Sequence, residues 1–108
     1  MKFFIDTANI DQIKEAIDLG ILDGVTTNPS LMAKEGIVGE DNIRKHYLAI
    51  AELVDGDVSA EVISTDFKGM VREGEILADL AENIIVKIPM IKDGVKAISY
   101  FANKGIET

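Results

Sequence analysis

Short apolar segments alternate with helical patterns along the whole chain, and this alternation limits the folds that the sequence can adopt. The expected strands begin near residues 2, 24, 58, 84 and 106, about 26 residues apart on average. Repeated alternation of this kind predicts parallel strands joined by right-handed crossovers. The strands also lack the regular polar alternation of a half-exposed antiparallel sheet, which favours a sheet that is buried on both faces.

Local signals place the individual elements. The expected strands are residues 3–5, 24–28, 57–63 and 83–89, and the expected helices are residues 10–19, 30–34, 41–54, 67–81 and 93–104. Asn9 and Gln12 form a capping-box pattern, and Gly20 and Gly105 are suited to left-handed helix ends. The last helix is expected to turn Val95, Ile98, Phe101 and Ala102 inward. Residues 106–108 then look like the entry to a fifth strand.

The spacing favours a barrel over an open sheet. Eight units of this length would need about 208 residues, near the size of a compact (β/α)8 barrel, and four units nearly fill the 108 residues. We therefore predict an α/β fold of TIM-barrel type, in which residues 1–108 form one domain covering the first four β/α units. A doubly wound open sheet is the alternative, but it normally has a Gly-rich phosphate loop after a strand. Asp6-Thr7-Ala8-Asn9 follows the first strand instead.

The composition limits the partners and the location of the protein. The net charge is −8, from 19 acidic and 11 basic residues. Such a surface repels phosphate backbones and anionic lipid, so we expect no nucleic-acid partner and no membrane partner. An anionic small substrate stays compatible, because one pocket can be positive inside an acidic protein. The chain has no cysteine and no long apolar run, and we expect a cytoplasmic location.

Polar side chains occupy the carboxyl ends of the expected strands. They are Asp6, Thr26, Asn28, Glu61 and Lys87. In parallel β/α barrels the active site lies at this end of the strands. Five polar groups that converge from four strands are difficult to explain by packing, so we take them as the candidate site.

Lys87 interrupts the apolar run from Ile84 to Met90. Lysine is almost never buried unless it is paired. Two structural roles would explain it simply: an edge-strand lysine that prevents strand pairing, or a strand-end lysine that reaches water. The functional interpretation is an amine that desolvation by aliphatic neighbours keeps neutral, so that it attacks a carbonyl and forms a Schiff base.

Two carboxyl groups could carry protons for such an amine. A Schiff-base aldolase moves protons while the carbinolamine dehydrates and the carbon–carbon bond breaks, which suits a carboxyl group near Lys87. Asp6 could simply cap the following helix, and taken alone that is the simpler interpretation. Glu61 lies within an expected strand, where it needs a partner, and Lys87 on the neighbouring strand could be that partner.

The remaining polar candidates differ in strength. Thr26 and Asn28 share strand parity, so both can face a substrate, whereas Thr27 would point away. His46 is the only histidine and is expected on a helix surface. One histidine without cysteine or a carboxylate cluster predicts no zinc site.

Four segments together resemble the transaldolase family, specifically the small branch that includes fructose-6-phosphate aldolases. They are Phe4–Ala8, Gly24–Ser30, Val58–Val62 and Ile85–Met90, and they occur in the family's order. The combination of T-T-N-P-S with V-K-I-P is far more specific than a lone glycine motif. The resemblance covers the whole chain.

This resemblance implies a role for each candidate residue. Lys87 would form the Schiff base with a ketose donor, Asp6 would transfer protons beside it, and Glu61 would position the catalytic water as the acid/base. Thr26 and Asn28 would hold the lysine and the dihydroxyacetone unit. The implied reaction, in the pentose phosphate pathway, moves that unit from a ketose phosphate to an aldose phosphate without a metal or an organic cofactor. Aldolases of this branch carry Gln where this chain has Glu61, which favours a transaldolase.

The chain departs from the family in what it lacks. We expect these 108 residues to lack the second set of four strands, with the family's phosphate-binding arginine and serine. Arg44 and Arg72 are expected on helices, where they would not replace them. Half a barrel would also leave strand edges and an apolar interior open, so we expect a homo-oligomer. The sequence leaves three alternatives to a transaldolase. They are a fructose-6-phosphate aldolase-type lyase, another lysine aldolase such as the deoxyribose-phosphate type, and a non-catalytic half-barrel that self-associates.

Overall fold

The four strands of the computed structural model, which describes residues 1–108, lie side by side in chain order. They are β1 (Phe4–Asp6), β2 (Gly24–Thr26), β3 (Asp57–Glu61) and β4 (Ile84–Lys87), and every neighbouring pair is parallel. The parallel pairing confirms the crossovers predicted from the alternating pattern. All four carboxyl ends therefore lie along the same edge of the sheet.

Five helices connect or follow the strands. They are α1 (Ile10–Asp18), α2 (Pro29–Lys34), α3 (Glu40–Leu53), α4 (Phe67–Ala78) and α5 (Lys92–Asn103). Asn9, Asn28 and Asp66 cap α1, α2 and α4 by accepting a backbone N–H bond, which satisfies donors that the first helical turn leaves free. Gly20 and Gly105 adopt positive φ just after α1 and α5, as predicted.

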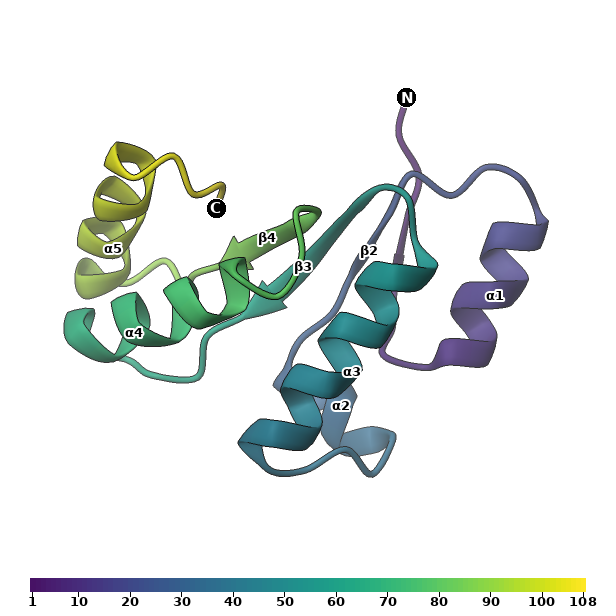
Figure 1. Ribbon diagram of the computed structural model, residues 1–108, viewed down its shortest axis with the longest axis horizontal. Coiled ribbons are helices and arrows are strands. Elements are labelled where there is room, and N and C mark those ends of the chain that lie inside the picture. Colours follow the sequence, from purple (N-terminus) through teal and green to yellow (C-terminus); the bar gives the residue numbers. More distant parts are fainter.

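All the helices lie on one side of the sheet. Figure 1 shows them as an arc around the strands, with one side of the sheet left open. The strand residues that face this arc, Val25, Val58, Ala60 and Val86, are fully buried. A doubly wound sheet has helices on both faces. The sequential strand order and the single helical layer instead give the first half of a TIM barrel, as the sequence predicted.

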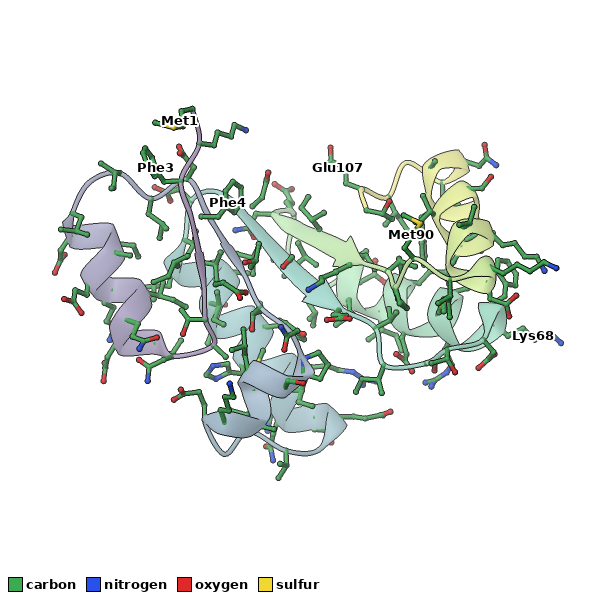
Figure 2. The ribbon with its side chains drawn as sticks, turned by 180° about the vertical axis from the view of Figure 1, so that it is seen from behind. Met1, Phe3, Phe4, Lys68, Met90 and Glu107 are labelled. Carbon is green, nitrogen blue, oxygen red and sulfur yellow. The ribbon has the colours of Figure 1, made fainter.

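The opposite face of the sheet is uncovered, as expected for half a barrel, whereas the strand pattern by itself favoured burial on both faces. Phe4 is 44% exposed and Ile63 is 59% exposed. Phe4 projects on the side away from α3 (Figure 2). The Val86 N–H donates to the Glu107 carbonyl at 3.0 Å, so the last residues run beside β4, where the fifth strand is expected.

Some element limits differ from the prediction. Helix α4 ends at Ala78, three residues before the predicted limit at Ala81. The inner face of α5 consists of Gly94, Ala97 and Phe101, whereas Val95 and Ala102 are exposed. Gly94 lies so close to the Pro89 carbonyl that a Cβ there would overlap it, and this close approach sets the rotation of the helix. None of the helices has the length and apolar character needed to span a membrane.

Candidate active site

The strand register places the predicted site residues on the open face of the sheet. Asp6, Thr26, Ser59 and Ile85 are successive partners across the four strands. Glu61 and Lys87 are partners two residues further along, and residues two apart on a strand face the same side. The open face therefore has two rows of side chains at the carboxyl edge, and most of them are polar.

Lys87 and Glu61 form an ion pair across β3 and β4. The Lys87 Nζ lies 3.5 Å from Glu61 Oε2, and the two side chains are 45% and 24% exposed. The prediction that Glu61 has Lys87 as its partner is confirmed. Lys87 is less desolvated than the apolar sequence around it suggested, because Ile84 and Val86 face the helices while Lys87 projects from the open face. An amine and a carboxylate in this contact can exchange a proton.

Asp6 and Thr26 form a second pair on the same face. They are register partners at the ends of β1 and β2, and the Thr26 hydroxyl donates to Asp6 Oδ1 at 3.0 Å. Asn9, and not Asp6, caps α1. The simple capping role considered for Asp6 is therefore wrong, and its carboxylate instead accepts the Thr26 hydroxyl on the open face.

Asn28 is held differently from the other four candidates. Its Oδ1 accepts the Leu31 N–H at 2.9 Å as the N-cap of α2. The structure records no contact between Asn28 and Lys87, so it does not bring these two residues together. The cap fixes the amide group at the end of β2 and leaves its NH₂ as a donor. Thr27 is fully buried on the helical side, as its parity predicted.

Ser59 belongs to the site face but was missed in the sequence analysis. It lies between Thr26 and Ile85 in the register, and its Oγ accepts the Thr27 N–H at 3.1 Å. This bond fixes its hydroxyl in the middle of the face. The parity that Ser59 shares with Glu61 was the signal that could have revealed it.

A carboxylate on α4 holds the loop that follows Glu61. Glu73 accepts the N–H groups of Ile63 and Ser64 at 2.6 and 3.1 Å, and it also accepts the Ser64 hydroxyl. Burial acts to raise the pKa of Glu73, but these hydrogen bonds and the nearby Arg72 outweigh it and lower the pKa below its ordinary value. Glu73 was also missed, since nothing local in the sequence links it to residues 63 and 64.

Arg44 lies near this loop but has its own partners. It lines a small cavity together with Glu61 and Glu73. Its guanidinium lies 3.4 Å from Glu40 and 4.0 Å from Asp41, one turn earlier on the same helix. No three His, Asp or Glu side chains gather closely enough to hold a metal ion.

His46 is not the free surface residue that the sequence predicted. Its Nε2 lies 2.6 Å from the Ala8 carbonyl oxygen, and its side chain is half-buried. The contact joins α3 to the loop between β1 and α1. His46 thus helps to fix the loop directly after Asp6.

Comparison with known proteins identifies the family. The model of the Transaldolase/Fructose-6-phosphate aldolase family matches residues 3–108. The chain belongs to this family. Three relatives are each named "Probable transaldolase": those of Porphyromonas gingivalis, Cytophaga hutchinsonii and Bacteroides thetaiotaomicron are 70%, 69% and 68% identical over all 108 residues. The match covers 49%, 50% and 50% of these proteins, so the chain spans about half the length of the curated relatives it matches.

Proposed function

We propose that these 108 residues supply the Schiff-base half of a transaldolase active site, with Lys87 as the amine that binds the ketose. The contact that supports this proposal most directly is the ion pair between Lys87 and Glu61 at the carboxyl ends of adjacent strands, 3.5 Å apart. The membership of the transaldolase/fructose-6-phosphate aldolase family and the names of the relatives support a sugar-phosphate substrate.

The proposed reaction begins when the unprotonated Lys87 Nζ attacks the carbonyl carbon of a ketose phosphate. The carbinolamine then loses water to give the imine. Loss of the proton from the C4 hydroxyl breaks the C3–C4 bond and releases an aldose phosphate, while the three-carbon unit stays on Lys87 as an enamine. The enamine attacks the aldehyde of the acceptor, and hydrolysis of the new imine releases a longer ketose phosphate and restores the amine.

Glu61 is placed to serve the steps that gain or lose water. It lies close enough to Lys87 to accept a proton from the ammonium and to return one to the departing hydroxyl, directly or through one water. Asp6, on β1, accepts the Thr26 hydroxyl and lies two strands from Glu61 and three from Lys87, so we assign it the proton transfer at the sugar hydroxyl. The hydroxyl of Thr26 and the amide NH₂ of Asn28 would hold the dihydroxyacetone unit.

A fructose-6-phosphate aldolase-type lyase is the alternative. It would use the same imine but release free dihydroxyacetone instead of passing it to an aldose. Glu61 favours the transferase, because the aldolases within the branch that this chain resembles carry Gln at the position of Glu61. A carboxylate can exchange the proton that glutamine cannot.

The test requires a protein of the relatives' length. We define the fusion protein as residues 1–108 joined to the part of the Porphyromonas gingivalis relative that lies outside the match. Incubation with fructose 6-phosphate and borohydride should reduce the imine onto one lysine, and peptide mass spectrometry should locate the adduct at Lys87. Lys92 and Lys96 lie nearby on α5 and serve as internal controls.

The second measurement distinguishes the two reactions. With fructose 6-phosphate and erythrose 4-phosphate, a transaldolase produces a seven-carbon ketose phosphate, whereas a lyase releases dihydroxyacetone.

An adduct on Lys92 or Lys96 would contradict the assignment of Lys87. Absence of any adduct, with Lys87→Met behaving like the parent, would favour the non-catalytic half-barrel.

A further inference from the structure

The backbone at Glu61 lacks a strand partner on one side. Successive N–H groups along a strand point to opposite neighbours, and the Val62 N–H donates to the Lys87 carbonyl on β4. The Glu61 N–H therefore points towards β2. The pairing of β2 with β3 ends at Thr26 and Ser59, two residues before Glu61. The sheet offers no acceptor to the N–H of the residue whose carboxylate contacts Lys87.

A tyrosine on α3 supplies that acceptor. The Glu61 N–H donates to the Tyr47 hydroxyl oxygen at 3.2 Å, and Tyr47 is fully buried. Its ring is fixed within the core between α3 and β3, so the hydroxyl has little freedom to move. The end of β3 is thus held on both sides, by β4 and by the Tyr47 side chain.

The phenol remains a neutral partner. Burial raises the pKa of Tyr47, the hydrogen bond from Glu61 acts to lower it, and the Glu61 charge raises it further. The hydroxyl therefore keeps its proton at neutral pH and still has lone pairs that accept the Glu61 N–H. A charged phenolate beside the Glu61 carboxylate does not arise.

We infer that Tyr47 is a positioning residue that holds the backbone at Glu61, so that the Glu61 carboxyl stays opposite Lys87. This inference deepens the proposed function, because it names the group that fixes its acid/base. Tyr47 is fully buried and its recorded hydrogen bond is the one from the Glu61 N–H, so we assign it an effect through Glu61. Without its hydroxyl, the Glu61 N–H has no partner, and only the neighbouring residues stay fixed, Val62 by β4 and Ile63 and Ser64 by Glu73. The Glu61 carboxylate then moves relative to the amine.

The first test does not depend on turnover. A carbodiimide joins a carboxylate and an amine in contact without adding a spacer, so the yield of the Glu61–Lys87 crosslink measures their proximity. In the fusion protein, Tyr47→Phe should lower this yield at least five-fold. The crosslink between Glu75 on α4 and Lys104 at the end of α5, which lie 3.4 Å apart, should keep its yield and thereby report that the packing of these helices is intact.

A matched variant controls for the loss of a phenol hydroxyl. Tyr100 donates to Glu75 at 2.8 Å, between α5 and α4, and has no contact with Glu61. Tyr100→Phe should leave the Glu61–Lys87 crosslink unchanged. An equal yield in the parent and in Tyr47→Phe would overturn the inference.

Kinetics add a readout that general destabilisation would not produce. Tyr47→Phe should lower kcat for transfer about ten-fold with KM unchanged, and it should cause no further loss in a Glu61→Gln background. An equal further loss in that background would overturn the inference. If the parent itself shows neither imine nor transfer, the proposed function fails, and the crosslink alone then decides the role of Tyr47.

Amide exchange keeps the inference testable if Tyr47→Phe does not fold. In the unmutated fusion protein, the Glu61 amide should exchange as slowly as that of Val62, although no strand accepts its N–H. Exchange of the Glu61 amide at the rate of an exposed loop amide would contradict the role of Tyr47.

Discussion

Glu61 and Lys87 are the last residues of β3 and β4, and they are direct partners in the parallel register. Their charged groups lie 3.5 Å apart. Glu61→Gln keeps the shape of the side chain but cannot carry a proton. General acid–base catalysis contributes about 10²- to 10⁴-fold, so transfer by the fusion protein should fall by at least about 100-fold. Borohydride should still trap the ketose on Lys87, although more slowly, because Glu61 serves the loss of water that forms the imine. Undiminished transfer would show that Glu61 is not the acid/base.

The second prediction concerns the hydroxyl between β1 and β2. Thr26→Val preserves the shape of the side chain and removes the donor to Asp6. A net hydrogen bond contributes about 0.5–1.5 kcal/mol, so kcat should fall between about 2-fold and 10-fold. Thr27→Val is the matched control, because the Thr27 hydroxyl is buried on the other face without a hydrogen-bond partner. That variant should retain activity and full stability, and an equal loss in both variants would count against a role for Thr26.

Strand parity predicted the candidate site residues that lie within the strands. Asp6, Thr26, Glu61 and Lys87 were assigned from their places at strand ends, and the register puts all four on one face. Asn28 followed the same parity, but the chain turns into α2 at that residue and uses its Oδ1 as a cap. Strand parity does not predict where a side chain bonds once the strand has ended.

Contacts between distant segments account for what the sequence did not reveal. Glu73 binds the backbone ten residues earlier, and Tyr47 binds the backbone fourteen residues later. Neither pair has a local pattern. The half-barrel fold was predictable from the regular spacing of strands and helices, and the sequential strand order agrees with it. The rotation of α5 about its axis was not predicted. The 3.6-residue period fits two adjacent faces of this helix, and the close packing of Gly94 selects one of them.

The third prediction is a pH dependence of stability at Glu73. The pKa of this group is lowered in the folded state, so its contribution is present above the ordinary pKa of glutamate and is lost as pH falls through the lower folded pKa. Glu73→Gln should reduce the free energy of unfolding of the fusion protein by about 1–2 kcal/mol at pH 7. Urea unfolding should show this difference shrinking as pH falls below about 4.3. Glu82→Gln, at an exposed carboxylate without a recorded partner, should have no such effect. A difference that stays constant with pH would show that the charge is not involved.

The fourth prediction concerns the 108-residue chain by itself. Phe3, Phe4, Leu19 and Ile21 are exposed and line one apolar groove beside β1, whose outer edge has no strand partner. Exposed apolar surface beside a free strand edge favours association. We expect the chain to sediment as a dimer or larger species at micromolar concentration. Phe4→Ser should weaken this association, while Val38→Ser, at an exposed apolar residue between α2 and α3, should not. A compact monomer would contradict the prediction.

The last prediction tests the packing of α4 against α5. Gly74 lies against the ring of Phe101, which is fully buried, and a Cβ at Gly74 would overlap the ring atom Cζ. Alanine in place of a helical glycine gains about 1 kcal/mol in helix propensity, whereas overpacking a core costs about 1–3 kcal/mol. The overlap should dominate because the Phe101 ring is fully buried in the core. Gly74→Ala should therefore lower the free energy of unfolding of the fusion protein by about 1–2 kcal/mol in urea. In a Phe101→Leu background the overlap is relieved, so the same change should become neutral or stabilising. An equal loss in both backgrounds would mean that something other than the Phe101 ring opposes a side chain at Gly74.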